Sequence, residues 1–300
     1  MNCYDLSKVD WLGLFNLIAV IVGFYFTSRE LRESRKQREQ ERKSIRLEHS
    51  IDCSRNFADL INNELSFIDS CLNNKKYDTA INTFRYEDLK LFDEREYLRL
   101  IEGRKEMEKY LHFFSDPDMV DLYFPDIVDA YIQNVELTPT EYSKIRTLIQ
   151  YEWKLSKEEH EYLKNNKLSK LEDKSSVDKY LSIMQKARDI NYYRQKITHY
   201  YFEQFTSMMN KLEYFSMTFT TNLADEEVVY PSLHQAFLKI VKYVYPYICH
   251  LNSGPSSDKY YTHIIELYNL WKDKYVKDQI VIRKNEEKIG NITVNTNSKF

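Results

Sequence analysis

Residues 11–38 read WLGLFNLIAVIVGFYFTSRELRESRKQR, and the change of character within this stretch decides the fold. No charged residue occurs from Trp11 to Ser28. As a helix rising about 1.5 Å per residue, this run would span roughly 27 Å, close to the hydrocarbon thickness of a bilayer. A helix in a soluble core would show a polar stripe, whereas apolar side chains cover every face here. The stretch therefore predicts a transmembrane helix over 11–28.

The charges on either side of this run set its orientation. The N-terminal side, residues 1–10, carries Lys8 beside two aspartates. The membrane-proximal basic residues on the other side are Arg29, Arg32, Arg35, Lys36, Arg38, Arg42 and Lys43. Because excess Lys and Arg stay in the cytoplasm, we expect 1–10 outside and the C-terminal body in the cytoplasm. A cleaved signal peptide fits less well, since its charge would precede the apolar run.

Small and polar residues share one stripe of the predicted membrane helix. At about 100° per residue, Asn16, Ala19 and Gly23 fall within about 60° of one another. Ala19 and Gly23 are small residues four apart, which lets two helix backbones approach closely. An asparagine at membrane depth needs a hydrogen-bond partner, and the same residue of a second copy is the simplest one. The stripe predicts self-association. The alternative is a monomeric tether in which Asn16 reaches water at the outer interface.

Composition excludes several classes of function. Residues 1–50 carry nine Lys/Arg against seven Asp/Glu, and the whole chain has a net charge of −3, so residues 51–300 carry about −5. This mildly acidic body has no basic stripe, which argues against a nucleic-acid partner. The five glycines form no phosphate-binding loop, and no cofactor is predicted. Reduced cytoplasmic thiols without zinc-binding spacing are expected at Cys3, Cys53, Cys71 and Cys249.

Periodicity predicts an all-α fold. We expect a charged helical stalk over 29–50, a cytoplasmic multi-helix bundle over 51–282 and a disordered polar tail over 283–300. The polar linker 165–176 is a point at which the bundle could divide in two. No stretch shows the sustained two-residue alternation of a strand. The first helix of the bundle is expected to bury Phe57, Ile61, Leu65, Ile68 and Leu72.

Local signals predict where the helices of the bundle begin and end. Residues 73–82 read as a turn, and helices are expected over 89–114, 177–220, 226–250 and 259–277. A capping residue followed by proline, or by glutamate three positions later, marks a helix start. Such starts are expected at Asp116 with Pro117, at Thr138 with Pro139 and Glu141, and at Ser156 with Glu159.

One residue pair resembles a catalytic motif. Arg194 and His199, in RQKITH, have the R-x4-H spacing found in HEPN-type RNA-cleaving domains, which are also all-helical. In those domains the pair acts on the 2′-hydroxyl and on the developing phosphate charge, usually across a dimer. Gln195 departs from the Asn, Asp or His usual after the Arg, and helical residues five apart point about 140° away from each other. The alternative is a surface arginine and an interior histidine.

Acidic residues gather before the middle of the chain, at Asp116, Asp118, Asp121, Asp126 and Asp129. Carboxylates at this density can hold Mg²⁺ or Ca²⁺. Counted from Asp116, however, the places where an EF-hand needs Gly and Glu hold Asp121 and Ile127. Helix N-termini favour acidic residues in any case. No metal site is therefore predicted, and cation binding by this cluster is left open.

Residues 211–271 combine an aromatic helix, an acidic helix start, a second aromatic helix ending in YPYI, a polar loop and a final helix. With the N-terminal span and the Arg-rich stalk, this layout resembles the bacterial single-pass membrane family called domain of unknown function 4760, loosely grouped with phage abortive-infection proteins. The resemblance implies a helical protein of the bacterial inner membrane and carries over no active residues. The expected function is a membrane-anchored interaction or sensor module in phage defence or stress response, without enzymatic activity. The alternatives are an RNA-cleaving effector using Arg194 and His199, and a structural scaffold.

Overall fold

The computed structural model describes residues 11–71, 75–102, 124–254 and 259–297. Within these ranges, the side chains of 11–23, 75–76, 78 and 283–297 are not described. Every regular element in the described residues is helical, so the predicted all-α class is confirmed. In chain order the elements are α1 (Trp11–Leu60), the π-helical turn η2 (Ile61–Leu65), α2 (Ser66–Cys71), α3 (Lys75–Asn82), the 3-10 turn η3 (Tyr86–Asp88), α4 (Glu94–Leu100), α7 (Phe124–Asn134), α8 (Pro139–Gln150), α9 (Lys157–Asn165), the 3-10 turn η5 (Leu168–Lys170), α10 (Lys174–Thr220), α11 (Glu226–Leu251) and α12 (Thr262–Asn297).

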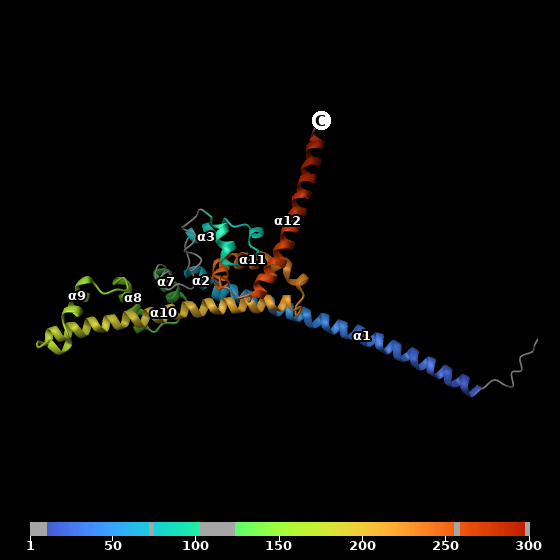
Figure 1. The fold of residues 1–300 in the computed structure, drawn as a ribbon, viewed down its shortest axis with the longest axis horizontal. Helices are drawn as coiled ribbons and strands as arrows, with labels where there is room; N and C mark the ends of the chain where they lie inside the picture. Colours follow the sequence, from blue (N-terminus) through green and yellow to red (C-terminus); the bar gives the residue numbers. More distant parts are fainter. Residues whose placement is uncertain (1–10, 72–74, 103–123, 255–258, 298–300) are drawn as a thin grey trace, which may run out of the picture.

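The molecule is elongated because two very long helices overlap only near their C-terminal ends (Figure 1). Helix α1 leaves the overlap in one direction and α10 in the other. Helices α11 and α12 pack against α10 and each other at the overlap and form the body. Helices α8 and α9 lie along the far half of α10, and we call this part the arm. The C-terminal part of α12 projects away from the body (Figure 1).

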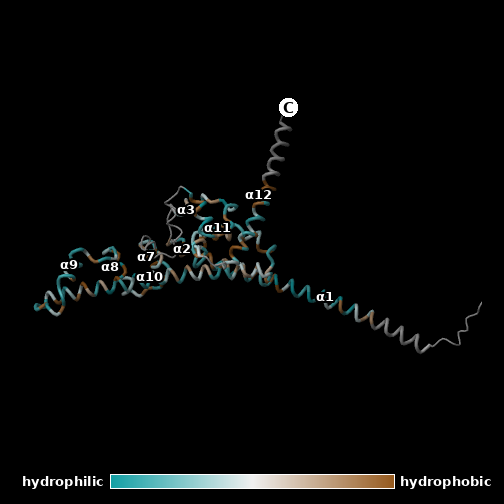
Figure 2. The backbone as a smooth tube through the Cα atoms, in the orientation of Figure 1, coloured by the Kyte–Doolittle hydropathy of each residue, from teal (hydrophilic) through white to brown (hydrophobic). Residues whose placement is uncertain are grey.

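The stalk segment of α1 is a continuous, solvent-exposed helix. Every side chain from Arg29 to His49 is exposed except that of Ser34, which is half-buried. Figure 2 shows this part of α1 as mainly hydrophilic outside the body. Ion pairs one turn apart join Arg29 to Glu33 at 3.0 Å and Lys43 to Glu39 at 3.3 Å. The basic residues that are predicted to lie next to the membrane are therefore on a solvent-exposed helix.

The predicted transmembrane segment, 11–28, is helical along its backbone. The side chains of 11–23 lie outside the described residues, and with them the predicted association stripe of Asn16, Ala19 and Gly23. Among the residues that are described, no helix has a stretch both long and apolar enough to cross a membrane.

The core is aromatic and lies where α1, α10, α11 and α12 meet. Trp271 of α12 is fully buried, with its ring 5.1 Å from that of Phe237 and 6.0 Å from that of Phe215. The end of α1 joins this cluster through Phe57, whose ring lies 4.5 Å from that of Phe215. Edge-to-face and tilted contacts of this kind add stability beyond the area that they bury.

The π-helical turn η2 modifies the predicted apolar face. Phe57 and Ile68 are buried as expected, whereas Ile61 and Leu65 are only half-buried. A π-turn holds an extra residue, which rotates the following positions relative to a regular helix. Glu64 is turned inward in consequence and accepts hydrogen bonds from Ser207 at 3.0 Å and from Lys211. The fifth predicted residue, Leu72, lies outside the described residues.

Two of the predicted elements are wrong. Residues 75–82 form helix α3 where a turn was expected, because Tyr77 and Ile81, four apart, are both buried and share a core-facing side. The helix expected over 89–114 is described only as α4, over Glu94–Leu100. Residues 89–93 are not helical, and Phe92 has a φ of 53°. Residues 103–114, and the start expected at Asp116 with Pro117, lie outside the described residues.

The other predicted helix starts and the long helices are confirmed. Thr138 with Glu141 and Ser156 with Glu159 each form the reciprocal capping box. Helices α10 and α11 match the expected 177–220 and 226–250 within a few residues. Helix α12 starts at Thr262 and continues to Asn297, where a disordered tail was expected from 283. Lys and Glu at 284–288 favour continuation of the helix there, whereas helix propensity does not account for residues 289–297, which are rich in Asn and Thr.

Candidate functional site

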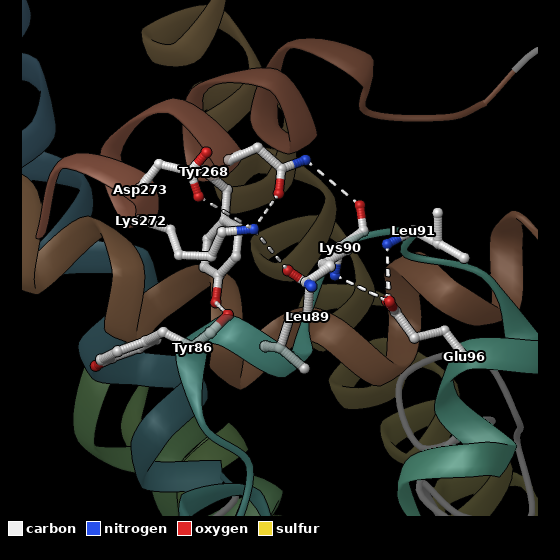
Figure 3. Close-up of polar contacts among 9 residues, drawn as sticks. Tyr86, Leu89, Lys90, Leu91, Glu96, Tyr268, Lys272 and Asp273 are labelled. Atoms are coloured by element: carbon white, nitrogen blue, oxygen red, sulfur yellow. Dashed lines mark hydrogen bonds and ion pairs between the residues drawn. The ribbon is translucent and has the colours of Figure 1, made fainter. Parts of the chain in front are cut away.

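The extended segment Leu89–Phe92 is held on one side by a buried carboxylate (Figure 3). The backbone N–H groups of Lys90, Leu91 and Phe92 donate to the carboxylate of Glu96 at 2.9–3.1 Å. The Tyr245 hydroxyl of α11 donates to the same group at 2.9 Å. Glu96 is only 3% exposed, and a buried carboxylate needs such donors to offset its lost hydration.

The carbonyl groups of the same segment accept hydrogen bonds from side chains of a distant part of the chain. The donors are Lys272 to the Leu89 carbonyl at 3.2 Å, Asn269 to Lys90 at 3.4 Å, Lys259 to Leu91, and Asn252 to Phe92 at 3.1 Å. Tyr268 donates in the same way to the carbonyl of Tyr86 at 3.2 Å. The segment is thus bound much as an extended peptide would be, by side chains from 245–272 (Figure 3).

Two apolar side chains fix the position of this segment. Leu89 and Phe92 are fully buried, while Leu91 points outward. The Phe92 ring lies 5.1 Å from Tyr245 and 5.2 Å from Tyr268. Its positive φ is a conformation that costs a residue other than glycine free energy, and the surrounding hydrogen bonds compensate for that cost. This arrangement positions and stabilises the backbone of the segment.

Two lysines are buried around this segment. Lys272, 5% exposed, donates to the Leu89 carbonyl and to Asn269 Oδ1 at 2.6 Å. Lys242 of α11, 8% exposed, donates to the carbonyl of Asn82 at 3.4 Å and lies 5.2 Å from the centre of the Tyr86 ring. Burial lowers the pKa of both ammonium groups. Lys242 also borders a hollow of about 320 Å³ between η3, α11 and α12.

The predicted catalytic pair is not brought together within one chain. The guanidinium carbon of Arg194 lies 4.6 Å above the Phe124 ring, and the arginine lines a hollow of about 500 Å³ next to α7. The His199 side chain is 75% exposed and its Nε2 lies 3.1 Å from Glu203 on the same helix. His199 is therefore on the surface, and the interior position considered for it is wrong.

Asp116, Asp118 and Asp121 lie outside the described residues, and no three His, Cys, Asp or Glu side chains within them are arranged to hold a metal ion. Further along, Asp126 has its pKa raised by burial and by the nearby Asp129. The described cysteines, Cys53, Cys71 and Cys249, are free and buried, and burial raises the pKa of each thiol.

Sequence reasoning missed Glu96, Lys242 and Lys272. Lys242 gave a signal, since it stands on the apolar face of a helix, four residues after Leu238 and three before Tyr245, both buried. Lys272 follows the fully buried Trp271 directly. Glu96 stands three residues after Asp93, the spacing of a helix start, but that pattern does not show that its carboxylate is buried and accepts from the loop before the helix.

The chain matches no protein-family model, and neither a curated protein nor a solved structure was found to match it.

Proposed function

We propose that this protein is a membrane-anchored helical module that senses or transmits a signal through contacts with other molecules. The observation that carries the proposal is the course of α1. One helix of 50 residues begins in the apolar run and ends in the core of the body. It is fixed there by Phe57 and by Ser50, whose hydroxyl accepts from the Asp225 backbone N–H at 2.7 Å.

The connection between the two ends of α1 is stiff. No glycine or proline occurs between Phe24 and Leu60, so the helix contains neither of the two strong helix breakers there. A displacement or rotation at one end is therefore expected to reach the α10–α11 packing at the other end. This supports a role in transmission more than a role as a loose tether.

Exposed aromatic side chains support anchoring at the outer end of α1. Phe24, Tyr25 and Phe26 are consecutive and are each more than half exposed. Consecutive exposed aromatic residues on a soluble surface are unfavourable, whereas aromatic rings are favoured at a membrane interface. The basic residues that follow would then face the cytoplasm, and the body with them.

Self-association is part of the proposal, and charge placement supports it. At about 100° per residue, the basic residues of the stalk fall on one half of α1. Glu30 and Glu33 fall on the other half, on the side that continues the stripe of Asn16, Ala19 and Gly23. Helices that associate through this stripe would keep their arginines apart. The role in phage defence or stress response rests on the family resemblance alone.

Alkaline carbonate extraction tests the anchoring. The full chain is expected to stay in the membrane pellet, and Leu17→Arg with Ile21→Arg should release it, because each charge at bilayer depth costs about 2.5–3.5 kcal/mol. The matched control is Leu31→Arg with Ile45→Arg, at exposed positions of the same helix, which should stay in the pellet. A wild-type chain that carbonate extracts would overturn the proposal.

A further inference from the structure

The two buried lysines differ in how well their charges are compensated. Lys272 has three oxygen neighbours, namely the Leu89 carbonyl at 3.2 Å, Asn269 Oδ1 at 2.6 Å and the Asp273 carboxylate at 3.9 Å. Lys242 has one described oxygen partner, the Asn82 carbonyl, at the long distance of 3.4 Å. An ammonium group has three donors, and a buried charge is costly unless it is paired. Lys242 is therefore a buried cation with unused binding capacity.

The surroundings of Lys242 leave part of its charge unbalanced. Asn82 is the last residue of α3, and the C-terminus of a helix carries roughly half a negative charge. Within the described residues, no carboxylate forms an ion pair with Lys242. The nearest loop contains Arg85, which is paired with Asp88 at 3.3 Å, and Glu87, which lines the hollow. Burial also lowers the pKa of Lys242, and an anion beside it would oppose that shift.

The hollow beside Lys242 has a polar end and an apolar wall. Lys242, Arg85 and Gln279 supply polar groups, and the Gln279 amide has no described hydrogen-bond partner. Val276 and Ile280 of α12 supply aliphatic surface. The volume of about 320 Å³ lies at the lower end of the range for small-molecule sites.

We propose that this hollow binds a small amphipathic monocarboxylate, with its carboxylate on Lys242 and its apolar part against Val276 and Ile280. A monoanion suits the site better than a phosphate dianion. Among the described residues that line the hollow, Lys242 is the one cation without an ion-pair partner, because Arg85 is paired with Asp88, and Glu87 of the lining would repel a second negative charge.

The site is placed to couple a ligand to the body. Tyr86 contacts Lys242 through its ring and Tyr268 through its carbonyl, so it joins the hollow to the clamped segment Leu89–Phe92. Its ring also lies 5.7 Å from that of Tyr275 on α12. A carboxylate would thus bridge η3, α11 and α12. This inference names a ligand for the sensor role and rests on the proposed function only for that role. Binding of the carboxylate itself does not depend on it.

Isothermal titration of the full chain in lipid nanodiscs tests the site, with empty nanodiscs as the blank and 3-phenylpropanoate as the probe. We expect saturable 1:1 binding. Lys242→Met should weaken binding at least about tenfold, as expected when one partner of a buried charge pair is removed. Ile280→Trp should also weaken binding, because it fills the hollow while it leaves Lys242 intact. It therefore tests the site even if Lys242→Met does not fold. Lys239→Met, an exposed lysine of the same helix, is the matched control.

Three results would each overturn the inference. They are the absence of saturable binding to the wild type at millimolar probe, unchanged affinity in both Lys242→Met and Ile280→Trp, and equal affinity for the uncharged 3-phenylpropanamide. The result is independent of the anchoring, since a chain that carbonate extracts can still bind the probe, and an anchored chain can fail to bind it.

Discussion

Helix α10 passes through two regions that are held together by different forces. Its C-terminal half lies in the body, where Tyr201, Phe205, Leu212 and Phe215 are buried among the rings of α11 and α12. Its N-terminal half carries the arm, where α9 has no buried residue and α8 buries only Ile145 and Leu148. The described ion pairs between α10 and the arm are Lys196 with Glu141 at 2.7 Å, Lys186 with Glu159 at 2.8 Å and Asp189 with Lys144 at 3.7 Å.

The difference between body and arm predicts different responses to solvent. Burial of aromatic surface contributes stability that depends little on pH or salt. Ion pairs near the surface contribute about 0–1 kcal/mol each and weaken as salt or protons screen or neutralise them. Helix α9 should therefore detach from α10 under conditions in which the body stays folded, whereas α8 keeps the apolar contacts of Ile145 and Leu148.

Trp271→Ala should destabilise the body most. The side chain is fully buried among Phe215, Phe219 and Phe237, and removal of such a ring costs about 3–5 kcal/mol. The free energy of unfolding from urea titrations of the full chain, followed by circular dichroism, measures the loss. Leu270→Ala, at the preceding and half-exposed position, is the control and should lose less than about 1 kcal/mol. Equal losses in the two variants would show that the aromatic cluster does not hold the body together.

Glu96→Gln should cost about 1–3 kcal/mol in the same assay, because the amide nitrogen cannot accept from the N–H groups of Leu91 and Phe92. The rate of hydrogen exchange of the Leu91 and Phe92 amides should increase in the same variant. The exposed Glu102→Gln is the control and should leave both quantities unchanged. Unaltered exchange in Glu96→Gln would mean that the segment is held by its apolar anchors alone.

Acid should loosen α8 from α10. The hydrogen bond from Lys196, followed by those from Thr138, lowers the pKa of Glu141 to about 2. Because this value is below the usual one, the contribution of Glu141 to docking is complete at neutral pH and is lost as pH falls from about 4.5 towards about 2. The distance between spin labels at Ser143 and Gln185 should broaden over that window. In Glu141→Gln the distribution should no longer change over that window, and a change as large as that of the wild type would contradict the assignment to Glu141.

Lys186→Met should have the smallest effect, below about 1 kcal/mol, on docking of α9. Its Nζ bonds to Glu159 at 2.8 Å and lies 3.7 Å from the centre of the Tyr151 ring, so the aliphatic replacement keeps part of the contact with the ring. In the wild type, molar salt should increase exchange of the α9 amides, and in Lys186→Met the same salt should add less. A salt response of equal size in both would assign the sensitivity to other charges.

Much of the fold could be predicted from local sequence. Capping boxes at Thr138 and Ser156 are complete within four residues, and the long helices follow from periodicity. Helix α3 was mistaken for a turn because its polar residues hid the buried pair Tyr77 and Ile81.

The candidate site could not be predicted in this way. The clamped segment depends on donors more than 150 residues away, such as Asn252 and Lys272, and no local pattern shows that they meet it. Lys242 alone was detectable, as a charge on an apolar helix face. The proposed binding role of Lys242, however, depends on the hollow that η3, α11 and α12 form beside it.

Body and arm are both proposed to lie on the cytoplasmic side of a membrane, and a C-terminal reporter fusion tests this most directly. With the full chain in a bacterial host, alkaline phosphatase at the C-terminus should be inactive and a fluorescent protein at the same position should be bright, because the basic residues after Ser28 hold that side in the cytoplasm. Active phosphatase with a dark fluorescent fusion would contradict the orientation. Fluorescence of the fusion that is as strong in the soluble fraction as in the membrane fraction would contradict membrane anchoring.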